Sequence, residues 1–271
     1  MDVSKVTQEE FTTLVRYMKD NYGINLSQKL ALVEGRLWNV IRQKGFASLK
    51  EYFEFVVSDK TGAEAKTLLT RLTTNYTYFM REDQHYKFLT GEILPDLTAR
   101  LRPRDLRIWS AGCSSGEEPY TTAMVLDDYF GSSKSQWDAK ILATDISPQV
   151  LQMAAEAVYP EDRLQNLPPV WKQKYFTKEP GDQFRVKESI KNEVVFRSFN
   201  LMESFPFKKP FHVIFCRNVM IYFDKPTRDG LIERYYDALA PGGYLFIGLS
   251  ETVDKTTTRF TFVRPSIYRK D

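Results

Sequence analysis

The stretch L-R-I-W-S-A-G-C-S-S-G-E-E-P-Y, residues 106–120, decides the fold class of this chain. Residues 106–112 form a short apolar run that predicts a strand, and a helix is expected from about Glu117 to Tyr129. A loop with two glycines, Gly112 and Gly116, joins them. A strand, a glycine-containing turn and a helix in this order are typical of the first unit of an α/β domain.

The same alternation continues to the end of the chain, with helices expected from about Pro148 and over 226–240. Further strands are predicted at residues 139–145, 193–199, 211–218, 244–250 and 260–270. Such alternation predicts a mostly parallel sheet with helices on both faces. Residues 171–190 break the pattern, because Pro180-Gly181 predicts the turn of a β-hairpin. We expect this hairpin as an insert, at about 171–192, between the second helix and the third strand.

Residues 1 to about 72 predict a separate domain that is entirely helical. Glycines are sparse there, prolines are absent, and apolar residues from Leu26 to Ile41 recur at spacings of three and four. Gly45 is then the expected stop signal of that helix. We therefore predict a helical domain at residues 1–72 and an α/β domain at residues 73–271.

Composition excludes several classes of protein. Of 271 residues, 42% are apolar and 27% charged, which is near the globular average and excludes disordered and collagen-like chains. A net charge of +3 is too small for bulk attraction to nucleic acid or to a membrane surface. The two cysteines, Cys113 and Cys216, argue against a disulfide framework or a zinc site. We therefore expect no metal and no nucleic-acid partner. No signal segment and no apolar run of about 20 residues is present, so we also expect no membrane insertion and a cytoplasmic location.

The loop at residues 112–116 is compatible with three kinds of site, since open α/β sheets bind ligands at the carboxyl ends of their strands. The dinucleotide fingerprint G-x-G-x-x-G is not met, because Ser114 replaces its second glycine. G-x-S-x-G instead matches the elbow of α/β-hydrolases, and the order Ser114, Asp145, His212 imitates their triad. The third site is the loop of an S-adenosylmethionine (SAM) methyltransferase. A plain tight turn is the structural alternative.

Two acids at the start of the predicted helix, Glu117 and Glu118, favour the methyltransferase loop. A carboxylate about 5 Å from a phosphate or an oxyanion costs roughly 3 kcal/mol at an effective dielectric near 20. The same carboxylate attracts a cation, and SAM carries an ammonium and a sulfonium but no phosphate. His212 begins an apolar strand and is interpreted as structural. Asp145, at the end of the second strand, would accept hydrogen bonds from ribose hydroxyls or cap the next helix.

Residues 74–82 (TNYTYFMRE) are similar to the TNxTxFFRE signature of the CheR chemoreceptor methyltransferases, and residues 113–120 (CSSGEEPY) resemble their CSTGEEPYS loop. Further segments match in family order at residues 143–147, 200–201, 216–223 and 239–245. The departures are Met80 for the usual phenylalanine and Ser115 for the usual threonine. The helical N-terminal segment also resembles the small domain of this family.

The resemblance implies a Rossmann-like, class I SAM-dependent methyltransferase with a small all-α N-terminal domain. It would esterify glutamate side chains on the cytoplasmic helices of methyl-accepting chemoreceptors and release S-adenosylhomocysteine. By motif, the residues of the cofactor site would be Asn75, Thr77, Arg81, Glu117, Asp145, Asn200, Leu201, Arg217 and Asn218. Arg81 and Tyr222 would lie near the transferred methyl group. The inserted hairpin resembles the β-subdomain with which the family docks on receptors.

A basic stretch of the helical domain is a second candidate for receptor contact. Residues 24–50 contain five basic residues and one acid, and Lys29 and Arg36 share one side of a helix. Composition alone is typical of a solvated face, whereas the resemblance implies contact with an acidic receptor helix. We expect a monomer. Two other functions stay open, a hydrolase that uses Ser114 and a receptor-binding adaptor without activity.

Overall fold

Four helices form the N-terminal part of the computed structural model, which describes residues 6–271. They are α1 (Gln8–Tyr22), α2 (Leu30–Gln43), α3 (Leu49–Ser58) and α4 (Ala63–Leu72). A capping box begins α1, since Thr7 accepts from the backbone N–H of Glu10 while the Glu10 carboxylate accepts from that of Thr7. The apolar faces of the helices meet in one core, which includes Leu14, Leu37 and Tyr52. The prediction that the second helix includes Leu26 is wrong, because α2 begins at Leu30.

A seven-stranded sheet forms the centre of the remaining chain, in the order β6-β2-β1-β7-β8-β10-β9. Its parallel strands are β1 (Ile108–Ala111), β2 (Ile141–Asp145), β6 (Val194–Ser198), β7 (Phe211–Cys216) and β8 (Leu239–Ile247). Two antiparallel strands, β9 (Thr261–Arg264) and β10 (Ile267–Arg269), complete one edge. The single strand predicted at 260–270 is therefore wrong, because the chain turns at Ser266, which has a φ of 63°. Pro241-Gly242-Gly243 lies inside β8 rather than before it.

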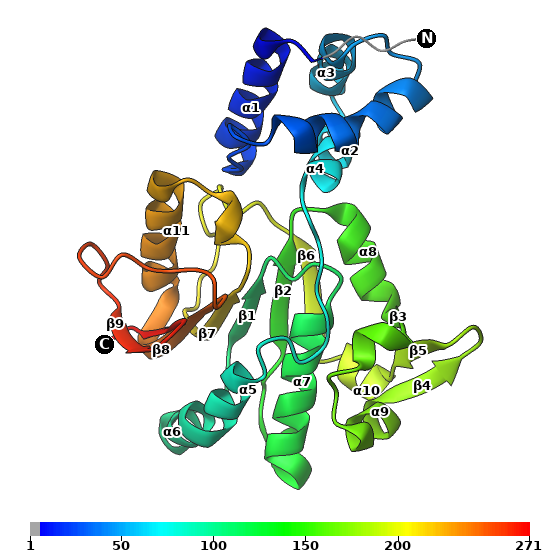
Figure 1. The fold of residues 1–271 in the computed structure, drawn as a ribbon. Coiled ribbons are helices and arrows are strands. Elements are labelled where there is room, and N and C mark those ends of the chain that lie inside the picture. The colour runs from blue at the N-terminus through cyan, green and yellow to red at the C-terminus, as the bar shows by residue number, and fades with distance from the viewer. Residues whose placement is uncertain (1–5) are drawn as a thin grey trace.

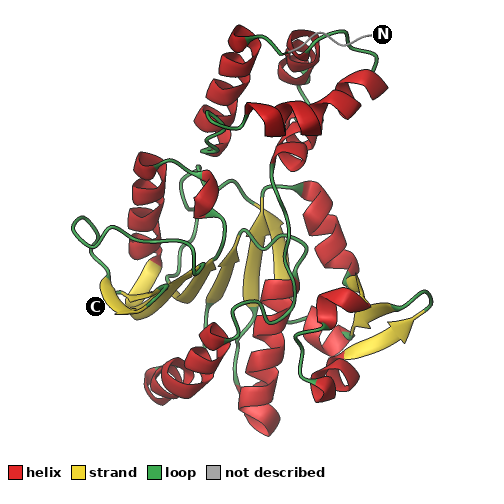
Figure 2. Ribbon diagram, viewed as in Figure 1, coloured by secondary structure: helices red, strands yellow, loops and turns green. Residues whose placement is uncertain are grey.

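Helices cover both faces of this sheet, as predicted and as Figure 2 shows. On one face lie α5 (Gln84–Phe88), η1 (Leu89–Ile93), α6 (Leu94–Arg100) and α7 (Glu117–Phe130), and on the other α11 (Lys225–Ala238). Successive strand residues alternate between the two cores, since Ile108 joins the first and Trp109 the second. A further helix, α8 (Pro148–Glu156), follows β2.

A small second sheet is inserted between α8 and β6. The predicted hairpin forms between β4 (Phe176–Glu179) and β5 (Gln183–Val186), with a turn at Gly181. A third strand, β3 (Val158–Pro160), pairs with β5, so this unit begins earlier than the sequence suggested. Its short helices are η3 (Glu161–Leu164), α9 (Pro169–Tyr175) and α10 (Glu188–Lys191). We call residues 158–191 the β-subdomain.

The helical domain is fastened to the carboxyl ends of the central strands, where Figure 1 shows it above the sheet. The backbone N–H of Asn25 donates to the carbonyl of Tyr222 (2.8 Å), and the Asn200 side chain donates to the carbonyl of Asn21 (2.8 Å). Lys19 and Asp224 form an ion pair at 2.7 Å. The loop between α1 and α2 therefore lies against the loops that follow β6 and β7.

Candidate active site

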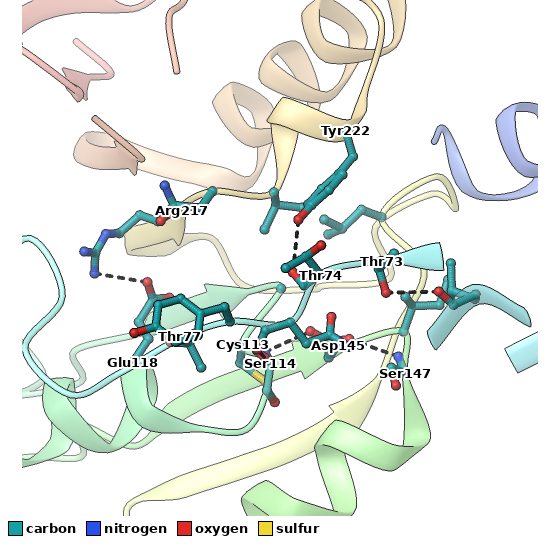
Figure 3. A pocket seen from close by; sticks show the side chains of 18 of the residues that line it. Thr73, Thr74, Thr77, Cys113, Ser114, Glu118, Asp145, Ser147, Arg217 and Tyr222 are labelled. Carbon is teal, nitrogen blue, oxygen red and sulfur yellow. Dashed lines mark hydrogen bonds and ion pairs between the residues drawn. The ribbon is translucent and has the colours of Figure 1, made fainter. Parts of the chain in front are cut away.

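A pocket opens at the carboxyl ends of β1, β2 and β7 (Figure 3). The strand order reverses between β1 and β7, and ligands of open α/β sheets bind at such a point. The pocket is lined by the linker after α4, by the loops after β1, β2, β6 and β7, and by Tyr22 and Ile24 of the helical domain. Parts of the chain that are distant in sequence thus meet at one cavity.

Nine of the ten residues predicted for the cofactor and the methyl group line this pocket. They are Asn75, Thr77, Arg81, Asp145, Asn200, Leu201, Arg217, Asn218 and Tyr222. The tenth, Glu117, does not line it. Tyr22, Ile24 and Glu118 do line it, although the prediction did not include them.

Glu117 and Glu118 have different surroundings although they are adjacent in α7. The Glu117 side chain is 1% exposed, accepts from the Ser115 hydroxyl (2.7 Å) and pairs with Arg163 (3.4 Å) behind the pocket wall. Glu118 lines the pocket and accepts from Ser110 (2.7 Å) and Arg217 (3.2 Å). Consecutive residues of a helix point about 100° apart, so only one of the two acids faces the cavity. Glu118 therefore lines the cavity and Glu117 lies outside its lining, while a role of Glu117 in cofactor binding stays a prediction.

Asp145 holds two of the loops that form the pocket. One carboxylate oxygen accepts from the backbone N–H of Ser114 and the other from that of Ser147, each at 2.9 Å. Burial raises the pKa of Asp145, while these backbone hydrogen bonds lower it in part. Ser147 occupies the N-cap position of α8, so Asp145 does not cap that helix. Its remaining lone pairs can accept hydrogen bonds from a ligand.

The glycine-containing loop is packed too closely for larger side chains. Gly112 has a φ of 83°, and a Cβ atom there would lie 2.4 Å from Val219. Gly116 has a φ of 95°, and its Cβ would lie 2.9 Å from Ala154. Both glycines are thus required by backbone conformation and by space.

The hydrolase triad does not form. The Ser114 hydroxyl donates to the carbonyl of Asn75 (3.0 Å), at the carboxyl end of β1. His212 lies at the opposite end of the parallel strands, near the start of β7, where its Nδ1 accepts from the backbone N–H of Arg107 (3.0 Å). The interpretation of His212 as a structural residue is therefore confirmed.

Arg217 is the centre of a buried ionic network beside the pocket. Its guanidinium donates to Glu82, to Glu118 and to the Tyr86 hydroxyl, each at 3.2 Å, and to the carbonyl of Arg81. Burial raises the pKa of Glu118, while the positive charge of Arg217 opposes that rise. Nothing in the sequence predicted that Glu82 and Tyr86 belong to this network. Glu82 was visible only as the last residue of the TNYTYFMRE segment.

Arg81 and Tyr222 approach the pocket from opposite loops. Arg81 donates to the carbonyl of Tyr76 (3.0 Å), and over residues 6–271 it forms no ion pair with a carboxylate. Its sequence neighbours Glu82 and Asp83 pair instead with Arg217 and Lys87. The Tyr222 hydroxyl donates to the carbonyl of Thr74 (3.0 Å), so it fixes the linker to the loop after β7.

Arg36 is engaged within the protein rather than free on its surface. Its guanidinium donates to the carbonyl of Thr73 (2.8 Å) and to the hydroxyl of Thr74 (2.6 Å). These bonds hold the linker beside Asn75, and the contact of Arg36 with a receptor stays a prediction. Lys29, at the N-cap of α2, is exposed.

The residues of the pocket fit a cationic ligand such as SAM. The side-chain oxygen of Asn218 is buried and lacks a hydrogen-bond partner within residues 6–271. Together with Glu118 and Asp145 it makes the pocket rich in acceptors, which suits an ammonium group and hydroxyls. Within the same residues, no cluster of three or more metal-ligating side chains occurs, and no helix is both long and apolar enough to cross a membrane.

Comparisons with known proteins point to one family. Residues 75–268 match the family model described as CheR methyltransferase, SAM binding domain, and residues 9–73 match CheR methyltransferase, all-alpha domain. A chemotaxis protein methyltransferase of Borreliella burgdorferi is 44% identical over 98% of this chain and 95% of its own length. A chemotaxis protein methyltransferase of Escherichia coli is 34% identical over 97% of this chain and 91% of its own.

One solved structure, a SAM-bound amino pentose methyltransferase from Micromonospora echinaspora, aligns over 65% of this chain and 58% of that chain. Its TM-score of 0.34 and identity of 16% are too low to support an argument. The family models and the curated relatives cover nearly the whole chain, in the order in which its two domains occur. On these matches, the chain belongs to the CheR methyltransferase family, with SAM as its cofactor.

Proposed function

We propose that this chain transfers the methyl group of SAM to glutamate carboxylates on the cytoplasmic helices of chemoreceptors, as a step of chemotactic adaptation. The observation that carries the proposal is the composition of one pocket. It joins acceptors for a cationic cofactor, Glu118 and Asp145, to Arg81, which has no carboxylate partner in the described chain. The curated relatives named chemotaxis protein methyltransferase support the choice of substrate.

The cofactor would be held by side chains that the structure already orients. Asp145 would accept from the ribose hydroxyls, and Glu118 and the Asn218 side-chain oxygen would accept from the ammonium group. Asn75, Thr77, Asn200, Leu201 and Arg217 would form the remaining walls. When bound, SAM supplies a methyl group on a positively charged sulfur, which makes that carbon electrophilic.

The acceptor glutamate needs positioning but no general base. Its ordinary pKa of about 4.3 leaves it deprotonated at neutral pH, and neither histidine of the chain lines the pocket. Holding two reactants in line can account for roughly 7–11 kcal/mol of a barrier. Arg81 would guide the incoming carboxylate by hydrogen bonds. It must hold that group loosely, since the carboxylate loses its charge in the transition state.

The rest of the chain would recognise the receptor. We assign substrate recognition to the helical domain, residues 1–72, with Lys29 as an exposed cation, and methyl transfer to residues 73–271. The β-subdomain would provide a second receptor contact. We propose that the protein acts as a monomer in the cytoplasm, where the receptor helices lie. Its two buried, unpaired cysteines suit a reducing compartment.

Methyl incorporation tests this function directly. Chemoreceptor cytoplasmic fragments are incubated with SAM labelled in its methyl group, and the label is measured before and after mild alkali. We expect alkali-labile label with the wild-type chain and none with Asp145→Ala, while Asp237→Ala on the outer surface of α11 behaves as wild type. Alkali-stable label would indicate methylated nitrogen and contradict the proposal. No label with any fragment would support the adaptor alternative.

A further inference from the structure

Two large apolar side chains are exposed on backbone segments that adjoin the pocket. Ile221, in η4 (Met220–Tyr222), is 52% exposed, and Leu249, after β8, is 49% exposed. Ile221 directly precedes Tyr222, which lines the pocket, and Leu249 directly follows Gly248. We call Ile221 and Leu249 the apolar rim.

One buried carboxylate, that of Glu251, joins the two backbone segments that carry the rim. Its Oε1 accepts from the backbone N–H of Ile221 (3.2 Å), and its Oε2 accepts from those of Asn218 (2.9 Å) and Gly248 (2.6 Å). A Cβ at Gly248 would lie 2.5 Å from the Asn218 side-chain nitrogen, so the two loops are pressed together. Ile221 and Leu249 are therefore presented by a fixed backbone next to Asn218, which lines the pocket.

Among the charged residues named here, Glu82 and Glu251 have partners, whereas Arg81 has no carboxylate partner within residues 6–271. The backbone N–H of Leu249 donates to Glu82 (3.3 Å), whose carboxylate also pairs with Arg217. Glu251 is occupied by backbone donors. Arg81, next to Glu82 in the chain, has no carboxylate partner within residues 6–271. The surface beside the pocket thus combines exposed apolar groups with one guanidinium.

We propose that the apolar rim is the docking surface for the methyl-accepting helix, and that it contacts uncharged side chains one turn from the acceptor glutamate. This inference rests on the proposed function. A glutamate side chain is short, so the helix that carries it must cross the mouth of the pocket. Residues three and four positions away then lie about 5–6 Å from it on the same face. Arg81 would pair with the acceptor carboxylate. Ile221 and Leu249 would contact apolar or small side chains of the receptor helix one turn from that glutamate.

The first test compares two double variants with a receptor cytoplasmic fragment that the wild-type chain methylates. Ile221→Ser with Leu249→Ser removes the rim. Met153→Ser with Val263→Ser removes apolar side chains that are 47% and 37% exposed and do not line the pocket. We expect the rim variant to lose at least tenfold in kcat/KM, through a higher KM for the fragment, with S-adenosylhomocysteine affinity within twofold of wild type. The control pair should retain wild-type kinetics. Equal kinetics in the two double variants would overturn the inference.

The second test changes the receptor fragment. Lysine is placed three and four residues to either side of the acceptor glutamate. We expect a loss of at least tenfold in kcat/KM with the wild-type enzyme and little further loss with the rim variant, because the contact is already absent. Equal losses with both enzymes would contradict the contact. A wild-type chain that methylates no receptor fragment would instead overturn the proposed function itself.

Discussion

The two domains differ in what they bury. In the described part of the helical domain, residues 6–72, the buried side chains are apolar or aromatic. In the α/β domain the interior also holds His85, Glu117, Arg217 and Glu251. Apolar burial stabilises a fold, whereas buried ions cost free energy unless they are paired. The difference indicates that the helical domain is built for stability and shape, while the α/β domain maintains a charged interior around its pocket.

Removal of Arg217 should have the largest effect. Arg217→Met leaves Glu82 and Glu118 buried without their cation, which costs about 3–5 kcal/mol when one partner of a buried pair is lost. We expect a loss of that size in the free energy of unfolding, measured by urea denaturation. Arg42→Met, at an exposed position of α2, is the control and should change it by less than about 0.5 kcal/mol. A loss below about 1 kcal/mol for Arg217→Met would show that the network is not effectively buried.

A truncation in the helical core should come next. Leu37→Ala removes a fully buried side chain of α2 and should cost about 3 kcal/mol of unfolding free energy, with a cavity left behind. Leu30→Ala, on the same helix but 37% exposed, is the matched control with a much smaller cost. At temperatures where Leu37→Ala remains folded, we expect its S-adenosylhomocysteine affinity to equal that of wild type. A parallel loss of affinity would show that the helical core shapes the pocket as well.

Acid should weaken the α/β domain through His85. Burial, with the nearby charge of Arg217, lowers the pKa of His85 to about 4. The unfolded chain binds this proton near pH 6.5, so His85 contributes stability that is complete above pH 6.5 and is lost as the pH falls towards 4. Buried carboxyls with raised pKa values act in the opposite direction, so the wild type is compared with His85→Gln. Between pH 7 and pH 4.5 we expect the free energy of unfolding of the wild type to fall by about 2 kcal/mol more than that of the variant. Parallel pH profiles would contradict this.

The domains also differ in how much of them the sequence predicted. Spacing of apolar residues predicted α2 and the core residue Leu37, because contacts within a helix are local. The main parallel strands followed from apolar runs. Two features were not predictable in this way: β3 has only three residues, and the β9–β10 hairpin depends on one left-handed residue, Ser266. Neither leaves a periodic pattern in the sequence.

Most residues of the candidate site were predicted only from the resemblance to the CheR family. Arg217 and Glu82 are 135 residues apart in sequence, and no local pattern indicates that they pair. Glu117 and Glu118 were indistinguishable, because the rotation of α7 about its axis is set by packing against the sheet. Tyr22 and Ile24 reach the pocket only because the helical domain docks on the loops after β6 and β7. Each of these facts depends on tertiary contacts.

The most direct test of the central claim, a SAM pocket with Glu118 on its surface and Glu117 behind it, is a calorimetric titration with S-adenosylhomocysteine. Wild type, Glu118→Gln and Glu117→Gln are compared at neutral pH. We predict binding by wild type, affinity about tenfold weaker for Glu118→Gln, equivalent to about 1.4 kcal/mol, and affinity within threefold of wild type for Glu117→Gln. No binding by wild type, or a greater loss for Glu117→Gln than for Glu118→Gln, would contradict the account.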